Sequence, residues 1–221
     1  STTSIFPVSE LSSAVLHAER LIGLHFFHPI RKTRFLEIVR TPVTSEATIA
    51  TMFALAHRVG KTAVLVSDAP GALVNRILGL FWNEALRLAE EGLPVGEIEK
   101  EMKVFGFTQG PFEMMDEAGL DFVDDLVAAL NLSLPHFFKP TALTGNFRKE
   151  ARLGKKNGRG FYLYRKKRPK LDEASLRRML DPAKADKTPG AAEARYAQLV
   201  DRLVLVMVNE ASRCLEEKVV E

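Results

Sequence analysis

The residues before and after Pro70 and Gly71 follow two different patterns, and this change limits the folds that the chain can adopt. Before it, three short apolar segments rich in β-branched and aromatic residues predict strands at 23–27, 34–40 and 62–68. After it, apolar residues recur mainly at the three- and four-residue spacing of amphipathic helices. We therefore expect a mainly α chain with an α/β portion at its N-terminus.

Both parts of the chain also contain segments that predict helices. Ser9 is a possible cap for a helix over 9–21, and Ser45 or Thr44 can cap a second one that Gly60 ends. Strand, helix and strand in this order suggest the edge of an α/β sheet. In the second part we expect helices over 72–91, 95–104, 110–130, 140–152, 172–180 and 191–217.

A helical unit occurs twice in the second part. Residues 75–92, NRILGLFWNEALRLAEEG, align with residues 201–218, DRLVLVMVNEASRCLEEK, at an offset of 126 residues. Seven of the 18 aligned residues are identical, and the shared block NEA-R--EE is difficult to obtain from helical patterning alone. We interpret the segments as two copies of one unit. The second copy stops at Glu221, where the first continues, so we expect a chain that is cut at both ends.

The composition excludes several classes of protein. Apolar residues make up 46% of the chain and charged residues 27%, which is ordinary for a globular protein, and no apolar run approaches the roughly 18 to 20 residues of a membrane span. A net charge of +3, without aromatics interleaved among base-reading residues, gives no support for nucleic-acid binding. The single Cys214 excludes an intrachain disulfide and favours a reducing compartment, such as the bacterial cytoplasm or the mitochondrial matrix.

His25 and His28, in GLHFFHP, could bind a metal, act in catalysis or simply pack. Side chains alternate faces along a strand, so two histidines three residues apart point to opposite sides and cannot share one metal ion. The chain has no His-Glu-x-x-His pattern and no thiolate cluster. We therefore predict no metal site.

Glu37 gives His25 a possible catalytic partner. A histidine titrates near neutrality, with an unperturbed pKa of roughly 6.5, and it works better as a base when a carboxylate holds its other nitrogen. Glu37 lies in the apolar segment 34–40, where an unpaired charge would be costly. If 23–27 and 34–40 are antiparallel neighbours, Glu37 can lie opposite His25. The alternative is a packed histidine and a surface glutamate on an edge strand.

Six blocks of the sequence, in order, resemble the L-3-hydroxyacyl-CoA dehydrogenase family. They cover nearly all of residues 1–164 and read GLHFFHP with FLEIV, TSEAT, GKTAVLVSDAPGALVNRIL, NEALRLAEEG, GFTQGPFEMMDEAGLD and GKKNGRGFYLY. STTS at the start is similar to the segment that closes the family's NAD domain. The duplicated unit, with VNEASRCLEE, further resembles the α subunit of the multifunctional fatty-acid oxidation complex, in which an enoyl-CoA hydratase domain comes first.

This resemblance implies a division of the chain. Residues 1–69 would be the C-terminal part of a Rossmann-type NAD-binding domain, and 70–185 the first all-helical C-terminal dehydrogenase domain. Residues 186–221 would begin a second, truncated copy of the helical unit. The family's partners would be a 3-hydroxyacyl-CoA substrate and other subunits of an oligomer or multienzyme complex, in which a thiolase subunit is one candidate.

The resemblance also implies roles for individual residues. It makes His25 the general base and Glu37 its orienting partner in the oxidation of L-3-hydroxyacyl-CoA by NAD, a step of fatty-acid β-oxidation. Ser4 and Asn75 correspond to polar residues around the substrate's hydroxyl and thioester carbonyl. His28 departs from the family, which often has asparagine there. It is either a tolerated replacement near the substrate and nicotinamide or a sign of altered activity.

One element of such an enzyme is not in the sequence. Dinucleotide binding uses a strand, a Gly-x-Gly-x-x-Gly turn and a helix N-terminus, and the 221 residues contain no such turn. We therefore expect little dehydrogenase activity from this chain alone. Two alternatives remain open: a non-catalytic helical module of a multienzyme complex, and a different hydroxyacid dehydrogenase that uses a lysine on a helix.

Overall fold

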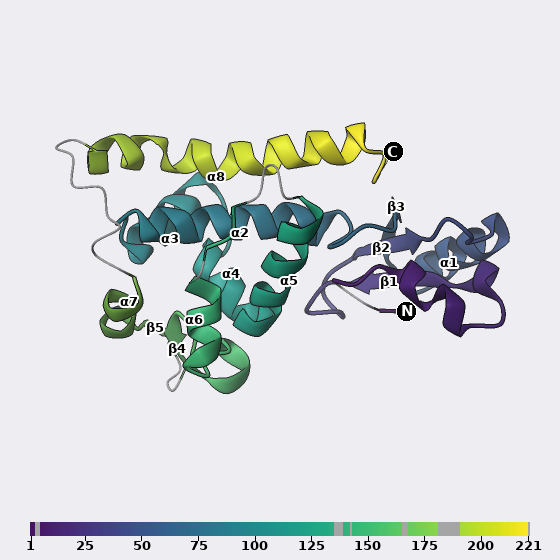
Figure 1. Cartoon of the computed structure of the whole chain (residues 1–221), viewed down its shortest axis with the longest axis horizontal. Coiled ribbons are helices and arrows are strands. Elements are labelled where there is room, and N and C mark those ends of the chain that lie inside the picture. Colours follow the sequence, from purple (N-terminus) through teal and green to yellow (C-terminus); the bar gives the residue numbers. More distant parts are fainter. Residues whose placement is uncertain (3–4, 135–138, 142, 165–167, 181–190, 221) are drawn as a thin grey trace. The chain divides into compact units, whose positions relative to one another are not determined.

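The computed structural model describes residues 1–2, 5–134, 139–141, 143–164, 168–180 and 191–220, with side chains from 196 onward in the last range. Contacts divide the chain into two compact units (Figure 1). The first unit contains Ser1–Ile77 together with Asn209–Glu221, and the second contains Leu78–Val208. The domain boundaries expected from the sequence stay a prediction.

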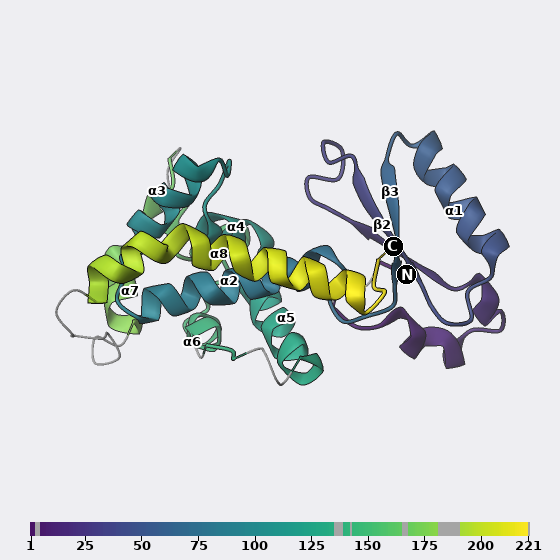
Figure 2. The same ribbon diagram turned by 90° about the horizontal axis from the view of Figure 1, so that it is seen from above.

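The first unit contains a three-stranded sheet in the order β1-β2-β3, and its strands are Ile22–Phe26, Phe35–Arg40 and Thr62–Ser67. β1 pairs antiparallel with β2, and β2 pairs parallel with β3. Helix α1, Glu46–Arg58, makes the crossover between the parallel strands and lies beside the sheet (Figure 2). The three strands were therefore predicted correctly. Val220 adds an isolated antiparallel bridge to Val66 of β3, so the end of the chain belongs to this unit.

The sheet of the first unit has two different faces because successive side chains alternate. Leu36 and Ile38 pack with α1 through Ile49 and Ala56. Val39 lies on the other face, in a cluster with Val8, Val66 and Ala72. Glu37, two residues before Val39 in β2, therefore also projects from the face opposite α1.

The helix predicted over 9–21 is wrong. The chain forms two short 3₁₀ helices instead, Val8–Ala14 and Ala18–Arg20. The N-cap position of the first is Pro7, so Ser9 does not act as the cap. The carboxylate of Asp68 accepts hydrogen bonds of 2.7 Å from the amides of both Val8 and Ser9. A side chain 60 residues away thus fixes this segment, and local helix signals do not report such a contact.

Helix α1 begins as predicted, because the Ser45 side chain accepts a hydrogen bond from the Thr48 amide. Only part of its apolar surface is buried. Ile49 and Ala56 are buried, but Phe53 and Leu55 are 37% and 39% exposed.

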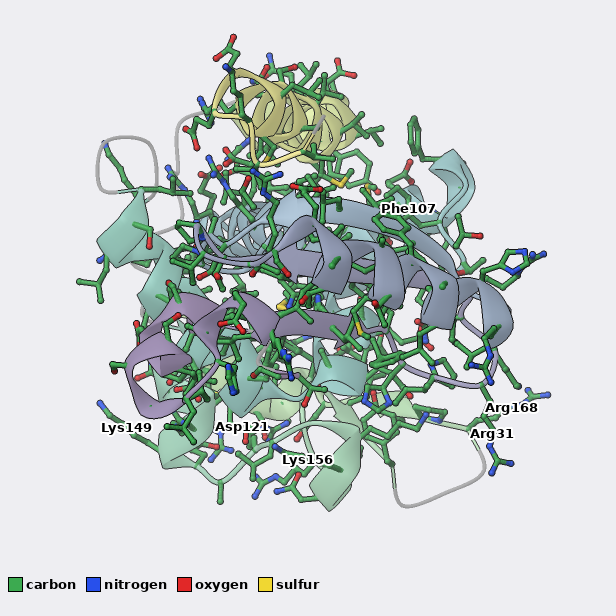
Figure 3. The ribbon with its side chains drawn as sticks, turned by 90° about the vertical axis from the view of Figure 1, so that its right-hand side faces the viewer. Arg31, Phe107, Asp121, Lys149, Lys156 and Arg168 are labelled. Atoms are coloured by element: carbon green, nitrogen blue, oxygen red, sulfur yellow. The ribbon has the colours of Figure 1, made fainter. Side chains whose placement is uncertain are left out.

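The second unit is mainly helical. Its helices, two of which extend into the first unit, are α2 (Val74–Glu90), α3 (Val95–Phe105), α4 (Pro111–Ala118), α5 (Leu120–Ser133), α6 (Leu143–Lys149), α7 (Glu173–Met179) and α8 (Ala191–Glu216). The single helix predicted over 110–130 is two helices, because Gly119 between them has φ 100°, which a helix does not accommodate. Lys156 pairs with Asp121 at the start of α5 (Figure 3).

A buried carboxylate organises the loop after α6. Asp116 of α4 accepts hydrogen bonds from the amides of Phe161 (2.9 Å) and Tyr162 (2.8 Å), and a Cβ on Gly160 would lie 1.9 Å from its Oδ1. Burial raises the pKa of Asp116 to about 6. The loop then forms a small two-stranded sheet from β4 (Tyr162–Leu163) and β5 (Lys170–Leu171), which the sequence analysis did not predict.

The two copies of the helical unit make equivalent ion pairs. In the second unit, Arg202 of α8 donates to Glu84 (2.8 Å) and Glu91 (2.7 Å). In the first unit, Arg76 of α2 donates to Glu210 (2.5 Å) and Glu217 (2.7 Å). Each residue of one set lies 126 positions from its equivalent in the other, so both Arg76 and Arg202 bind the glutamates of the opposite copy.

No helix among the described residues combines the length and apolar character that crossing a bilayer would require.

Candidate active site

His25 and Glu37 face each other across two antiparallel strands. They are directly paired in the register of β1 and β2, and His25 Nδ1 lies 2.5 Å from Glu37 Oε2. The two strands are thus antiparallel neighbours, which was the condition for Glu37 to lie opposite His25, and it does lie there. The catalytic role of the pair stays a prediction. Glu37 is fully buried and His25 is 6% exposed, so water does not compete for this hydrogen bond.

The second carboxylate oxygen of Glu37 is also bound. Oε1 accepts hydrogen bonds from the backbone amides of Leu73 (3.2 Å) and Val74 (2.8 Å), at the start of α2. Free amides at a helix N-terminus favour negative charge. They therefore compensate negative charge on Glu37 in a site where an unpaired carboxylate would be costly.

These contacts fix the tautomer of His25. A carboxylate can only accept a hydrogen bond. His25 Nδ1 therefore carries the proton and is the donor in the hydrogen bond to Glu37. Nε2 is left with its lone pair, 3.3 Å from the side-chain Nδ2 of Asn75, which can donate to it. Asn75 is 5% exposed and stands in the first turn of α2. The arrangement presents one unprotonated imidazole nitrogen beside an amide donor.

The surroundings of His25 are mostly apolar. The ring centroids of Phe27 and His25 lie 4.5 Å apart, and those of Phe27 and Phe35 lie 5.5 Å apart. A cavity of about 10 Å³, about the room that one water molecule occupies, is bordered by His25, Asp68 and Gly71 among others.

The remaining predicted site residues are less closely connected. His28 is exposed and lies two residues beyond the end of β1, in the loop that also carries the exposed Arg31 (Figure 3). Ser4 lies outside the described residues. Within the described part of the chain, no three His, Cys, Asp or Glu side chains are grouped so that they could hold a metal ion.

The amides of Leu73 and Val74 were not predicted from the sequence. Backbone groups carry no residue signature, but Pro70 and Gly71, just before a long helix, mark a turn at whose end free amides occur.

Comparison with known families matches both parts of the chain. Residues 1–69 match the NAD binding domain of 3-hydroxyacyl-CoA dehydrogenase, and residues 71–164 match the C-terminal domain of the same enzyme. The cofactor predicted from the sequence, NAD, is the one for which the first of these domains is named.

Solved structures agree with these matches. The chain is 33% identical to (S)-3-hydroxybutyryl-CoA dehydrogenase PaaH1 from Ralstonia eutropha (TM-score 0.70) and 32% identical to M. tuberculosis FadB2 (TM-score 0.71). The alignments cover 75% and 74% of this chain and 59% of each relative.

A third structure, the dehydrogenase part of multifunctional enzyme 1 from C. elegans, is 27% identical (TM-score 0.65). Here the alignment covers 100% of this chain and 50% of that one. The chain thus spans between half and three fifths of the length of these three proteins. On these matches and on the fold, it belongs to the 3-hydroxyacyl-CoA dehydrogenase family.

Proposed function

We propose that this chain supplies the general base for NAD-dependent oxidation of an L-3-hydroxyacyl-CoA to the 3-ketoacyl-CoA, as a step of fatty-acid β-oxidation. The observation that carries the proposal is the buried pair of His25 Nδ1 and Glu37 Oε2 at 2.5 Å. It leaves Nε2 free of a proton and directed toward Asn75. A base of this kind suits removal of a proton from a hydroxyl near neutral pH.

In the proposed reaction, His25 Nε2 takes the proton of the substrate's C3 hydroxyl, and the imidazolium that forms is stabilised by Glu37. NAD⁺, when bound, would supply the acceptor for the hydride of C3. Loss of the hydroxyl proton to His25 and of the hydride to that acceptor converts the alcohol into a ketone, so charge and atoms balance. In the reverse direction the imidazolium returns its proton to the carbonyl oxygen.

Three further residues have proposed roles at the substrate. The amide of Asn75, next to His25 Nε2, can donate a hydrogen bond to the substrate's oxygen, and Ser4 would contribute a second polar contact by the family resemblance. The same resemblance puts His28 near the nicotinamide, and its exposed position just after β1 leaves room for a ligand.

The residues present fit the proton transfer but not the phosphates of the cofactor. A dinucleotide's pyrophosphate rests on a glycine-rich turn before a helix, and this sequence has no Gly-x-Gly-x-x-Gly. Helix α1, which follows strand β2, begins at a serine cap instead. We infer that a nucleotide-binding segment elsewhere, on the same or another polypeptide, completes the enzyme. The likeness to a multifunctional enzyme also supports a multienzyme assembly. An enoyl-CoA hydratase and a thiolase subunit are the members that the family resemblance implies.

The test follows NADH formation from a 3-hydroxyacyl-CoA, with the chain joined to that nucleotide-binding segment. We expect His25→Gln to lower kcat by about 10²–10⁴-fold, the range that a general base contributes. His28→Asn serves as a comparison in the neighbouring loop, and we expect its kcat to stay close to that of the parent.

Other outcomes would point elsewhere. An inactive parent that His28→Asn restores would mean that His28 has changed the chemistry of the site. If the complete protein bound its assembly partners but stayed inactive in every form, the helical assembly module would be the better interpretation.

A further inference from the structure

The turn before α2 has an unusual backbone. Gly71 has φ 74° and Ala72 has φ 48°, so two successive residues adopt the left-handed conformation. For Ala72 this conformation is strained, because its Cβ crowds the neighbouring carbonyl. Ala72 is nevertheless held there: its amide donates to Ala69 O (2.9 Å), and its side chain is buried with Val8, Val39 and Val66.

The strained turn determines where the next amides point. Leu73 and Val74 follow it directly, and both of their N–H groups converge on Glu37 Oε1. Successive amides that follow left-handed residues form a concave site for a negatively charged oxygen. Here the oxygen belongs to the protein itself. The other oxygen of the same carboxylate binds His25 Nδ1 at 2.5 Å.

From this geometry we propose that the Gly71–Ala72 turn is a positioning element for the base. It holds the Glu37 carboxylate by one oxygen, so that the other meets the histidine in a single orientation. The inference rests on the proposed function of His25. It adds that a backbone turn outside the His25–Glu37 pair sets the efficiency of the proton transfer.

Gly71 is the position at which this proposal can be tested. A Cβ there would lie 3.0 Å from the Arg76 amide nitrogen and 3.3 Å from the Arg76 Cα, both of which are backbone atoms at the start of α2. Gly71→Ala therefore combines an unfavourable φ with displacement of the helix start. The two amides on Glu37 would move with it.

Gly60 offers a matched control. Its φ of 72° is almost the same as that of Gly71, but no atom of the described residues lies within 4 Å of a Cβ placed there. Gly60 follows the C-terminal end of α1. Gly60→Ala should thus impose similar backbone strain without touching the Glu37 contacts.

The experiment compares both alanine variants in the protein joined to its nucleotide-binding segment. We expect Gly71→Ala to lower kcat by about 10- to 100-fold with little change in KM, because small misplacements of a catalytic group have effects of this size. Gly60→Ala should lower the melting temperature but leave kcat unchanged. Equal kcat values for the two variants would overturn the proposal.

A double-mutant cycle separates positioning through Glu37 from a general loss of structure. In a Glu37→Gln background, Gly71→Ala should reduce kcat by clearly less than it does in the parent, because the group it positions is already altered. Full additivity would contradict the proposal.

If Gly71→Ala does not fold, hydrogen exchange gives an independent test. The amides of Leu73 and Val74 should exchange faster in Glu37→Ala than in the parent, because the oxygen that accepts from them is removed, whereas unchanged exchange would overturn the inference. If His25→Gln loses activity but Gly71→Ala and Gly60→Ala have equal kcat values, only this inference is refuted. A neutral His25→Gln would refute the proposed function itself.

Discussion

Glu37 has two different tasks, one for each carboxylate oxygen. Oε2 orients His25, and Oε1 is held by the amides of Leu73 and Val74. Each task requires an acceptor. An amide side chain at this position could satisfy only one of them, because its nitrogen would have to face a donor.

We therefore expect Glu37→Gln to lower kcat by about 10²–10⁴-fold. If the amide nitrogen faces His25, Nδ1 must become an acceptor, which moves the proton to Nε2 and removes the base. Steady-state kinetics gives the loss, and ¹⁵N NMR of the imidazole reports the tautomer. Glu10→Gln, at an exposed position of the same unit, is the control and should change neither. A wild-type tautomer together with wild-type kcat would show that Glu37 does not orient His25.

At the scale of elements, Asp116 joins α4 to the loop that leads into β4. Its carboxylate is fully buried and accepts from two amides and, at 3.1 Å, from the Tyr164 hydroxyl. Burial raises its pKa to about 6 in spite of these donors. The folded protein therefore keeps a proton on Asp116 at pH values where the unfolded chain, with a pKa of 3.8, has released it.

This difference predicts how stability depends on pH. Between about pH 4 and pH 6 the folded state binds more protons than the unfolded state, so the contribution of Asp116 to the free energy of unfolding falls as pH rises. The free energy of unfolding of the wild-type protein minus that of Asp116→Asn should be larger at pH 5 than at pH 7, by about 1 kcal/mol. Urea unfolding of both proteins at the two pH values measures this change. A difference that grows with pH would contradict the expectation.

The ion pairs of α2 and α8 allow a comparison of equivalent residues in two environments. The Arg76 side chain is 5% exposed, and its partner Glu210 is fully buried, whereas the Arg202 side chain is 25% exposed. Removal of one partner from a buried pair leaves a charge that is only partly compensated. Exposed pairs contribute much less.

We expect Arg76→Met to lower the free energy of unfolding by about 3 kcal/mol, since Arg213 remains 2.8 Å from Glu210 and limits the loss. Arg202→Met should cost about 1 kcal/mol. Chemical denaturation of the two variants, at low and at high salt, tests this order. A larger loss for Arg202→Met would mean that burial does not govern these pairs.

At the scale of the whole molecule, the sequence predicted the features that depend on local pattern. The strands and most of the helices follow from apolar spacing. The position of Glu37 opposite His25 was expected only if segments 23–27 and 34–40 were antiparallel neighbours, and the register of β1 and β2 meets that condition. The features it missed depend on distant contacts. Asp68 determines the conformation of Val8 and Ser9, and the amides that hold Glu37 come from 36 and 37 residues further along the chain.

The absence of a glycine-rich turn leads to a prediction for the 221 residues taken alone. Without a site for the pyrophosphate, we expect NADH formation from a 3-hydroxyacyl-CoA close to background, even though the base is in place. Addition of the nucleotide-binding segment should raise the rate far above that level. Robust turnover by the 221-residue chain alone would contradict this expectation and would require a different way of binding the cofactor.

The reciprocal pairing of the two helical copies has a consequence for how the protein responds to dilution. Two separate helices of this kind would associate less as their concentration fell, whereas copies carried by one polypeptide meet at an effective concentration that the connecting chain sets. The equilibrium between paired and separated copies is then independent of how much protein is present. Dilution of the protein therefore does not separate the two helical copies, as it would separate two helices on different chains.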